Sequence, residues 1–316
     1  MRILVLGAGV SGLSSGILLL KKGYQVTIWA KDLPPNTTSD KAAAAWAPYL
    51  CNPKEKVMRW GKNTLDYFNR VIAKDSKSGY MKIKTAGLFT AAKNDQWWQD
   101  IVPGYRRIPA KDLPAGYQDG YEFEGLVVDT TYYMDWLVSL FKGLGGVLIQ
   151  KEISSINEAF AEYNLVVNCT GLGSRKLFGD TSIFPVRGQM VKVKLNGFNK
   201  IIADEEGPNS LAVIIPRTHD VLLGGTTQEN NWSLEIDPKD TQDILKKVAS
   251  IYPELKNAEV IGESVGLRPV RPEVRLEAQK FGGKVVIHNY GHGGAGFTLS
   301  WGCAQEVVDL VNKVLL

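Results

Sequence analysis

The sequence predicts an α/β fold, in which a β-rich domain is inserted in two pieces into a domain of the nucleotide-binding type. Strand–helix patterns open the chain, return near residue 165 and close it, whereas the stretches between them alternate as short strands and turns. The length of 316 residues suits two domains of about 150 residues each. We expect residues 1–75, 125–185 and 270–316 to form the first domain, and residues 76–124 and 186–269 to form the second.

The first element is a β-α-β unit. Residues 3–6 are a continuous apolar run of the length expected for a strand buried on both faces. Apolar residues then recur at helical spacing over residues 13–20, up to Gly23, and a second strand follows over residues 25–29. Between the first strand and the helix lies the turn Gly7-Ala8-Gly9-Val10-Ser11-Gly12. This order of strand, glycine turn, helix and strand is typical of a Rossmann-like domain.

The glycines of this turn have separate physical tasks. Gly7 permits the tight turn, Gly9 lets a pyrophosphate approach the backbone, and Gly12 allows the helix to pack closely on the strand. The N–H groups at the helix start, including those of Val10 and Ser11, attract phosphate together with the positive end of the helix dipole. We therefore predict a dinucleotide site here, the alternative being a glycine turn needed only for packing.

The ribose end of that site departs from the usual pattern. At the end of the second strand, where an acidic residue commonly binds the ribose, the sequence has Ala30. Asp32 or backbone groups would then make this contact. Lys31 has two interpretations that stay open, a phosphate ligand or a surface residue.

The remaining elements follow in the same way. Helices are expected over residues 57–72, over residues 132–142 with Gly143 as the C-terminal cap, and from a cap at Asp240 or Thr241 to Ile251. The last helix is expected over residues 298–315. Strands are expected over residues 80–91, 165–168, 188–194, 211–224 and 284–288.

Composition narrows the function classes. With 44% hydrophobic and 22% charged residues, the chain is typical of a globular enzyme. Its 37 basic and 33 acidic residues are interspersed, so the net charge of +4 favours neither nucleic acid nor a membrane as partner. No apolar run reaches the ~20 residues that span a bilayer. The three cysteines cannot all pair, and with the three histidines they show no metal-ligand spacing, so we expect a cytoplasmic protein without a metal.

Four further segments carry a family resemblance over most of the chain. They are Thr37-Thr38-Ser39-Asp40 with the run 44–50, Val167-Asn168-Cys169-Thr170-Gly171, the run 266–277, and the run 288–298. In order and spacing they resemble the D-amino-acid oxidase family. The resemblance implies FAD as cofactor and a D-amino acid as substrate, which is oxidised to the 2-oxo acid with release of ammonia. It also implies molecular oxygen as electron acceptor and hydrogen peroxide as a product.

The same resemblance assigns residues to the cofactor. The glycine-rich run that ends at the last helix points unpaired N–H groups at its surroundings, which suits a flavin ring that gains negative charge on reduction. Hydroxyl groups of the threonine-rich loop suit the pyrophosphate. The predicted FAD-binding residues are Gly7, Gly9, Val10, Ser11, Gly12, Lys31, Asp32, Thr37, Thr38, Ser39, Ala44, Ala45, Trp46, Ile153, Thr170, Gly171, Arg275, Gly293, Gly294, Gly296, Phe297 and Thr298.

Arg275 is the residue that we expect to bind the substrate. By the resemblance it makes a two-point contact with the α-carboxylate, for which a planar guanidinium is suited. Arg268 and Arg271 are expected to form structural ion pairs. The family's chemistry needs no side-chain general base, so His292 is expected to have a positioning role, and Cys303 to be a buried helix residue.

The sequence departs from the family pattern at the substrate pocket. Val213 stands where the family usually has a tyrosine, just before Ile214-Ile215-Pro216, and Tyr49 is the candidate substitute. The lid, residues 203–208, is short. A pocket walled by Val213 and Ile202 favours a neutral, apolar substrate.

Two alternatives to a D-amino-acid oxidase stay open. One is another amine-oxidising flavoenzyme, either glycine-oxidase-like, active on a modified or cyclic amino acid, or a dehydrogenase. The other is a flavin-binding protein with a regulatory or structural role, against which Arg275 argues. Residues 313–316 lack the S-K-L peroxisomal signal, which agrees with a cytoplasmic location. The sequence does not tell which amino acid is the substrate, and it leaves a homodimer open.

Overall fold

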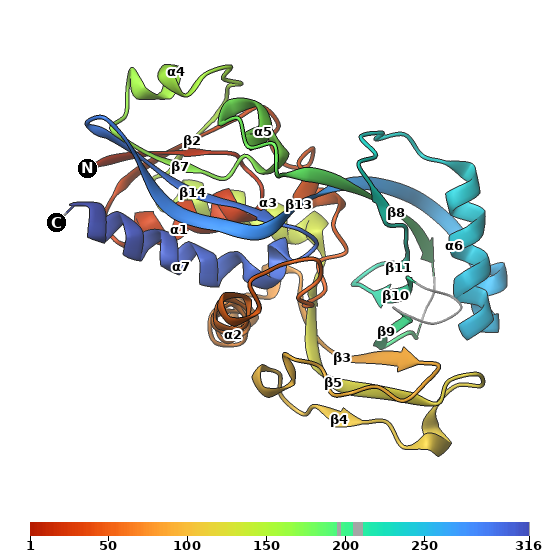
Figure 1. Cartoon of the computed structure of the whole chain (residues 1–316). Helices are drawn as coiled ribbons and strands as arrows, with labels where there is room; N and C mark the ends of the chain where they lie inside the picture. Colours follow the sequence, from red (N-terminus) through yellow and green to blue (C-terminus); the bar gives the residue numbers. More distant parts are fainter. Residues whose placement is uncertain (195–196, 205–210, 316) are drawn as a thin grey trace.

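A single mixed sheet runs through the molecule (Figure 1). The computed structural model describes residues 1–194, 197–204 and 211–315, and within them the sheet has 14 strands. The strand order is β4-β5-β3-β9-β10-β11-β8-β13-β14-β7-β1-β2-β6, with β12 paired to β8. The described helices do not include one that is both long and apolar enough to cross a membrane.

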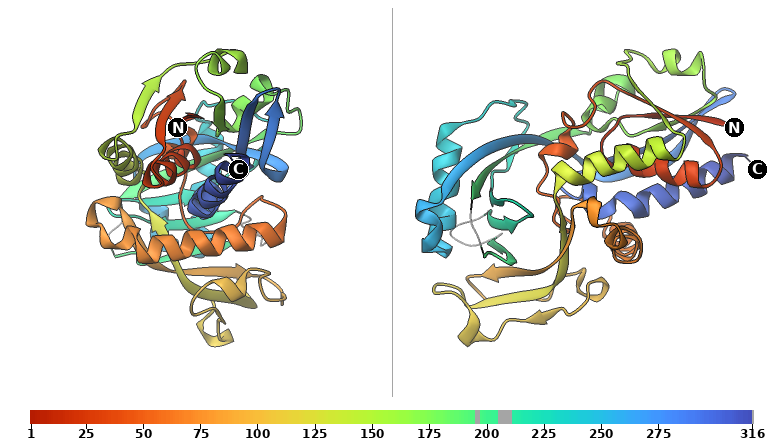
Figure 2. Two further views of the ribbon diagram at one scale, coloured as in Figure 1. Left: turned by 90° about the vertical axis from the view of Figure 1, so that its left-hand side faces the viewer. Right: turned by 180° about the vertical axis from the view of Figure 1, so that it is seen from behind.

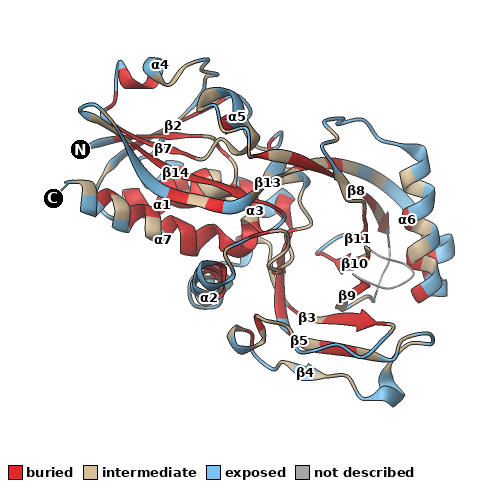
Figure 3. Cartoon of the chain, in the orientation of Figure 1, coloured by how far each residue is buried: buried red, intermediate tan, exposed pale blue. Residues whose placement is uncertain are grey.

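One end of the sheet is parallel. Its strands are β1 (Arg2–Leu6), β2 (Gln25–Ala30), β6 (Val147–Gln150), β7 (Leu165–Asn168) and β14 (Lys284–His292). One face is covered by α1 (Val10–Lys21), α3 (Thr130–Gly143) and α7 (Gly296–Leu315), and α2 (Lys54–Arg70) packs on α7 (Figure 1). Short helices α4 (Ile156–Phe160) and α5 (Ser174–Leu177) lie on the other face. Burial on both faces explains why β1 and β7 are continuous apolar runs (Figure 3).

The other end of the sheet is mainly antiparallel. Its strands are β3 (Tyr80–Phe89), β4 (Arg106–Arg107), β5 (Asp119–Val128), β8 (Phe184–Lys194), β9 (Lys200–Asp204), β10 (Ala212–Pro216), β11 (Val221–Gly224) and β12 (Gln228–Glu229). Helix α6 (Pro238–Ile251) buries Ile244, Val248 and Ile251 in a cluster with apolar residues of β8, β10 and β11. The rest of α6 faces solvent (Figure 3).

Strand β13 (Glu259–Phe281) joins the two ends of the sheet. It pairs with β8 over residues 259–270 and with β14 over residues 270–281, and its register shifts between Val270 and Arg275. Figure 2 shows it as one curved ribbon that spans the molecule. The predicted domain boundaries at residues 125 and 270 fall inside the continuous strands β5 and β13.

The predicted elements at the two ends of the chain, β1, α1, β2, β14 and α7, are confirmed. The range 211–224 is two strands, β10 and β11, separated by a turn. Short 3₁₀ helices complete the described chain: η1 (Thr38–Lys41), η2 (Ile72–Lys74), η3 (Ser76–Ser78), η4 (Gln99–Ile101), η5 (Ala110–Asp112), η6 (Gly171–Gly173) and η7 (Pro253–Asn257).

The predicted cap of α6 is wrong. Asp237 caps this helix by accepting a hydrogen bond from the backbone N–H of Lys239, and Pro238 occupies the first helical position, where its missing N–H costs nothing. Asp240 lies inside the first turn and forms an ion pair with Arg187 at 2.7 Å.

Candidate functional site

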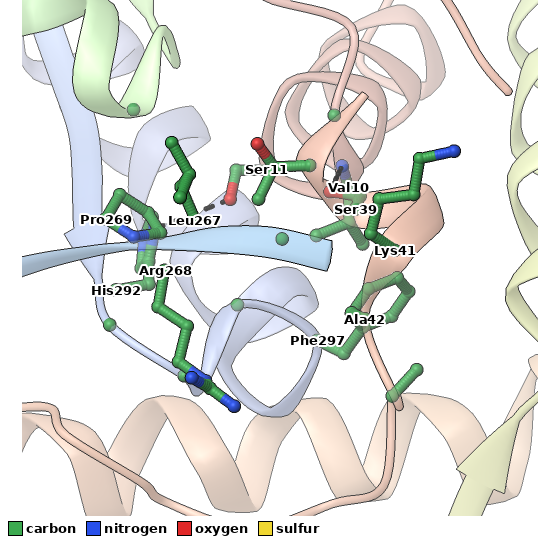
Figure 4. Close-up of a pocket in the computed structure, with 18 of the residues that line it drawn as sticks. Val10, Ser11, Ser39, Lys41, Ala42, Leu267, Arg268, Pro269, His292 and Phe297 are labelled. Carbon is green, nitrogen blue, oxygen red and sulfur yellow. Dashed lines mark hydrogen bonds between the residues drawn. The ribbon is translucent and has the colours of Figure 1, made fainter. Parts of the chain in front are cut away.

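A cavity of about 780 Å³ lies between the two parts of the sheet. Its lining comes from the turn between β1 and α1, the loop 37–49, the ends of β2, β6 and β7, strands β8, β10, β11 and β13, and the turn between β14 and α7. Figure 4 shows how segments far apart in sequence converge there, with Ser11 and Ser39 on one side and Arg268, Pro269 and His292 on another.

The glycine fingerprint forms one wall. Gly7 has a left-handed φ of 104°, and a Cβ on Gly12 would overlap the carbonyl oxygen of Gly7, so only glycine fits at both positions. Gly9 is the N-cap of α1, and the N–H of Val10 donates to Ser39 Oγ at 3.0 Å. The structure therefore presents the start of α1 to the cavity, while Gly12 packs behind the wall and does not line it.

The predicted nucleoside residues lie on the same cavity. Lys31, Asp32 and Ile153 all line it, and Lys31 also forms an exposed ion pair with Glu152 at 3.7 Å. Thr170 and Gly171, which follow β7, line it as well.

The loop 37–49 supplies a second wall. Thr37, Thr38, Ser39, Ala44, Ala45 and Trp46 line the cavity. The hydroxyl of Thr37 is already engaged, because it donates to Asp40 in a capping box at 2.6 Å. Trp46 is fixed by its indole N–H, which donates to the carbonyl of Gly61 at 3.3 Å.

The turn between β14 and α7 closes the third side. Gly293, Gly294, Gly296 and Phe297 line the cavity. Gly293 has φ of 55°, and a Cβ there would overlap the carbonyl oxygen of Leu50, so the turn packs directly on the loop 37–50. Thr298 does not line the cavity. Its hydroxyl instead bridges the N–H and the C=O of Ala47, at 3.0 and 2.8 Å, and ties that loop to α7.

The structure does not place Arg275 in the cavity. Its guanidinium forms an ion pair with Glu277 at 2.8 Å and donates to Tyr290 Oη and Gln279 Oε1, both at 3.0 Å. Arg275 lies beyond the register shift of β13, where this strand pairs with β14. The prediction that Arg275 faces the substrate and the cofactor is therefore corrected.

Arg268 occupies the position expected for Arg275. It lies on the part of β13 that pairs with β8, and its guanidinium lines the cavity 5.8 Å from the centroid of the Tyr49 ring. Nη1 donates to the carbonyl of Thr226 at 3.1 Å. A Cβ on Gly188 would overlap the guanidinium, so this glycine makes the room for it. Burial lowers the pKa of Arg268.

Arg268, which is partly buried, differs in its charge balance from the buried residues Arg187 and Arg217. Arg187 pairs with Asp240 at 2.7 Å, and Arg217 pairs with Asp220 at 2.6 Å. Among residues 1–194, 197–204 and 211–315, no carboxylate lies within 4.0 Å of the Arg268 guanidinium. Partial burial desolvates this cation and no counter-ion offsets the cost, so the arrangement suits a ligand that brings a negative charge. The prediction that Arg268 is a structural ion-pair residue is thus wrong, whereas Arg271 does pair with Asp180 at 2.9 Å.

Tyr49 and Val213 complete the surroundings of Arg268. Tyr49 Oη lies 3.0 Å from Thr227 Oγ1, and Val213 lies opposite Gly224 on the neighbouring strand β11. The lining from β8, β9 and β10 is apolar and consists of Met190, Ile201, Ala203, Val213 and Ile215, while Thr85 of β3 and Tyr121 of β5 add hydroxyl groups to the cavity. Ile202 is buried in the cluster under α6 and does not line the cavity. Of the predicted lid 203–208, residues 205–208 lie outside the described residues.

The two other residues singled out in the sequence, His292 and Cys303, are buried. His292 lines the cavity, and burial lowers its pKa to about 4, so the ring is neutral at pH 7. Cys303 is fully buried in α7, as predicted. The described residues contain no group of three or more His, Cys, Asp or Glu side chains arranged to hold a metal ion.

Comparisons with known proteins agree over the length of the chain. The sequence profile of the FAD dependent oxidoreductase family matches residues 2–310. The chain is 49% identical to a D-amino-acid oxidase from Dictyostelium discoideum, with 99% of this chain and 92% of that protein covered. It is 42% identical to one from Rubrobacter xylanophilus (99% and 97%) and 35% identical to human D-aspartate oxidase (99% and 95%). The glycine oxidase of Bacillus cereus ATCC 14579 has a similar structure, with a TM-score of 0.81, 19% identity and coverage of 99% and 95%.

Proposed function

Because this chain belongs to the family of FAD-dependent oxidoreductases, we propose that it oxidises the carbon–nitrogen bond of a D-amino acid. One amino acid, one oxygen and one water give the 2-oxo acid, ammonia and hydrogen peroxide. The observation that carries the proposal is the partly buried guanidinium of Arg268, which has no carboxylate partner among the described residues and lines the cavity. Relatives that are 42–49% identical and named D-amino-acid oxidase support it.

The residues that line the cavity fit FAD. A Cβ on Gly9 would come within 3.0 Å of Ser39 Oγ, so the chain leaves an open approach to the start of α1, where the helix dipole favours a pyrophosphate. Ile153 and Thr170 would hold the adenosine end, and the turn of Gly293 and Gly294 would lie against the flavin ring. When bound, FAD supplies the two-electron oxidation of the substrate. In this proposal the parallel part of the sheet holds the cofactor and the mainly antiparallel part holds the substrate.

Arg268 binds the substrate carboxylate in this proposal. Its planar guanidinium offers two parallel N–H groups, and a carboxylate would neutralise the charge that burial leaves unpaired. The hydroxyl of Tyr49 is the nearby candidate for a further hydrogen bond, because the family's tyrosine is replaced by Val213. We assign no general base to the chain, since the fixed carboxylate is enough to orient the α-carbon.

The walls beside Arg268 favour a neutral, apolar side chain on the substrate. Met190, Val213 and Ile215 offer no hydrogen-bond partner for a second carboxylate, so burial of one would go uncompensated. We therefore expect apolar D-amino acids to be better substrates than acidic ones. A cytoplasmic location and a homodimer stay predictions, which cell fractionation and sedimentation would test.

The decisive experiment is anaerobic reduction of the purified yellow protein. D- and L-amino acids, glycine and cyclic amines are added one at a time while the flavin absorbance is recorded. Bleaching by apolar D-amino acids, with return of colour and one peroxide per oxo acid in air, is the expected result. Bleaching by glycine or a cyclic amine alone would show that the substrate belongs to that class and not to the D-amino acids. Bleaching without reoxidation by oxygen would instead identify a dehydrogenase.

A further inference from the structure

Ser11, Ser15, Asn289 and His292 form a buried hydrogen-bonded chain between the start of α1 and the end of β14. Ser15 Oγ donates to the carbonyl of Ser11 at 2.7 Å, and Asn289 Nδ2 donates to Ser15 Oγ at 3.1 Å. Asn289 Oδ1 lies 3.0 Å from His292 Nε2, and His292 Nδ1 lies 3.5 Å from Ser11 Oγ. Ser11 and His292 line the cavity (Figure 4). None of these contacts is needed to bind the substrate carboxylate.

These contacts fix the protons of Ser15, Asn289 and His292. Ser15 has one hydroxyl hydrogen, which the carbonyl of Ser11 takes, so its oxygen can only accept. The group of Asn289 that faces Ser15 is therefore the NH₂, which turns the amide oxygen toward His292. Because an amide oxygen cannot donate, Nε2 of His292 carries the proton. In a neutral ring Nδ1 then has a free lone pair.

His292 lines the cavity, so a ligand hydroxyl that takes the place of Ser11 as partner of Nδ1 would find a hydrogen-bond acceptor there. Nδ1 faces the hydroxyl of Ser11, but 3.5 Å is the upper limit for such a bond, so the contact is weak. A phosphate oxygen or a flavin carbonyl could not bind there, since each is itself an acceptor. A hydroxyl group could.

We propose that His292 Nδ1 accepts a hydrogen bond from a hydroxyl of the ribityl chain of FAD, and that Ser15 and Asn289 hold the ring in the tautomer that this requires. The inference rests on the proposed placement of FAD. His292 lies between the start of α1, which suits the pyrophosphate, and the turn 293–297, which suits the flavin ring. The ribityl chain is the part of FAD that joins these two groups, and it carries hydroxyls.

The test compares FAD with three analogues that each lack one ribityl hydroxyl, at the 2′, 3′ or 4′ carbon. Dissociation constants are measured from the fluorescence of ligand released on dilution of the loaded full-length protein. The wild type should bind one analogue about tenfold more weakly than FAD, as expected for one net hydrogen bond. His292→Leu should bind FAD about tenfold more weakly and should no longer distinguish that analogue from FAD. His288→Gln, which replaces the buried histidine outside the cavity, is the matched control, and it should keep the discrimination.

Three results would overturn the inference. The wild type could bind all three analogues as tightly as FAD, His292→Leu could retain the full discrimination, or His288→Gln could abolish it. Should His292→Leu fail to fold, ¹⁵N NMR of the wild-type histidine ring decides instead. An unprotonated Nδ1 whose resonance moves with only one analogue is expected, and a protonated Nδ1 contradicts the inference. Failure of the wild type to bind FAD at all would count against the proposed function instead.

Discussion

Replacing the two arginines of β13 separately tests which one binds the substrate. Arg268→Met removes the partly buried guanidinium, and Arg275→Met removes the one that pairs with Glu277. The first change deletes two charge-assisted hydrogen bonds to the substrate carboxylate, each of about 1.5–3 kcal/mol. A loss of at least ~3 kcal/mol in transition-state binding lowers kcat/KM roughly 10²-fold. Arg275→Met should change kcat/KM less than about threefold, since its contacts lie outside the cavity.

The thermal stability of the two variants should change in the opposite order, so that Arg275→Met is the less stable one. Arg268 has no counter-ion among the described residues, so an apolar side chain of similar length relieves a desolvated charge and the melting temperature should hold or rise. Arg275→Met loses a partly exposed ion pair worth on the order of 1 kcal/mol or less, and should melt slightly lower. The assays are oxygen uptake against D-amino acid concentration and thermal unfolding of the same holoproteins. If Arg275→Met lost activity 10²-fold while Arg268→Met kept it, the assignment of the substrate arginine would be refuted.

Three further predictions concern other residues of the site and the buried histidine outside it. Gly188→Ala should raise KM roughly tenfold or more without weakening FAD binding, because its Cβ displaces the guanidinium of Arg268, the residue proposed to bind the substrate. Gly262→Ala is the control: its Cβ meets only the Cδ of Lys192 at 3.7 Å, outside the cavity, and KM should not change. Thr298→Val should weaken FAD binding about three- to tenfold by freeing the loop at Ala47, and Thr298→Ser should not, as fluorescence titration would show. Burial lowers the pKa of His288 to about 4, below its ordinary value near 6.5, so the unfolded chain binds more protons between these limits. Stability should therefore fall as the pH drops from 6.5 toward 4, and His288→Gln should reduce that loss in urea unfolding; an identical pH slope would contradict it.

The parts of the site that sequence could predict are those encoded within a few residues. The fingerprint around Gly7 and Gly12 combines a strand, a turn and a helix in one segment, so its spacing predicts its geometry. The loop at Thr37 and the turn at Gly293 were predicted by resemblance, and both lie on the cavity.

The choice between Arg268 and Arg275 could not be made in this way. Which arginine faces the cavity depends on where β13 exchanges β8 for β14, and that exchange is a property of long-range pairing. The hydrogen-bonded side chains that link Ser11 to His292 connect residues 281 apart in the sequence, and no local sequence pattern predicts this link. The cap of α6 had a readable signal, the Asp237-Pro238 pair, which is typical of a helix start.

The continuity of β13 limits how the molecule can move. One strand carries the arginine proposed to hold the substrate and then forms an edge-to-edge ladder with β14, which leads directly into the turn at the cofactor end. A swing of the two ends of the sheet about a hinge would therefore have to bend β13 between Val270 and Arg275, where its register shifts. The two ends should unfold as one cooperative unit, and an exchange of the antiparallel part between relatives would need cuts within strands. We therefore expect the cavity to open through loops at its rim, with the sheet as the frame that holds them.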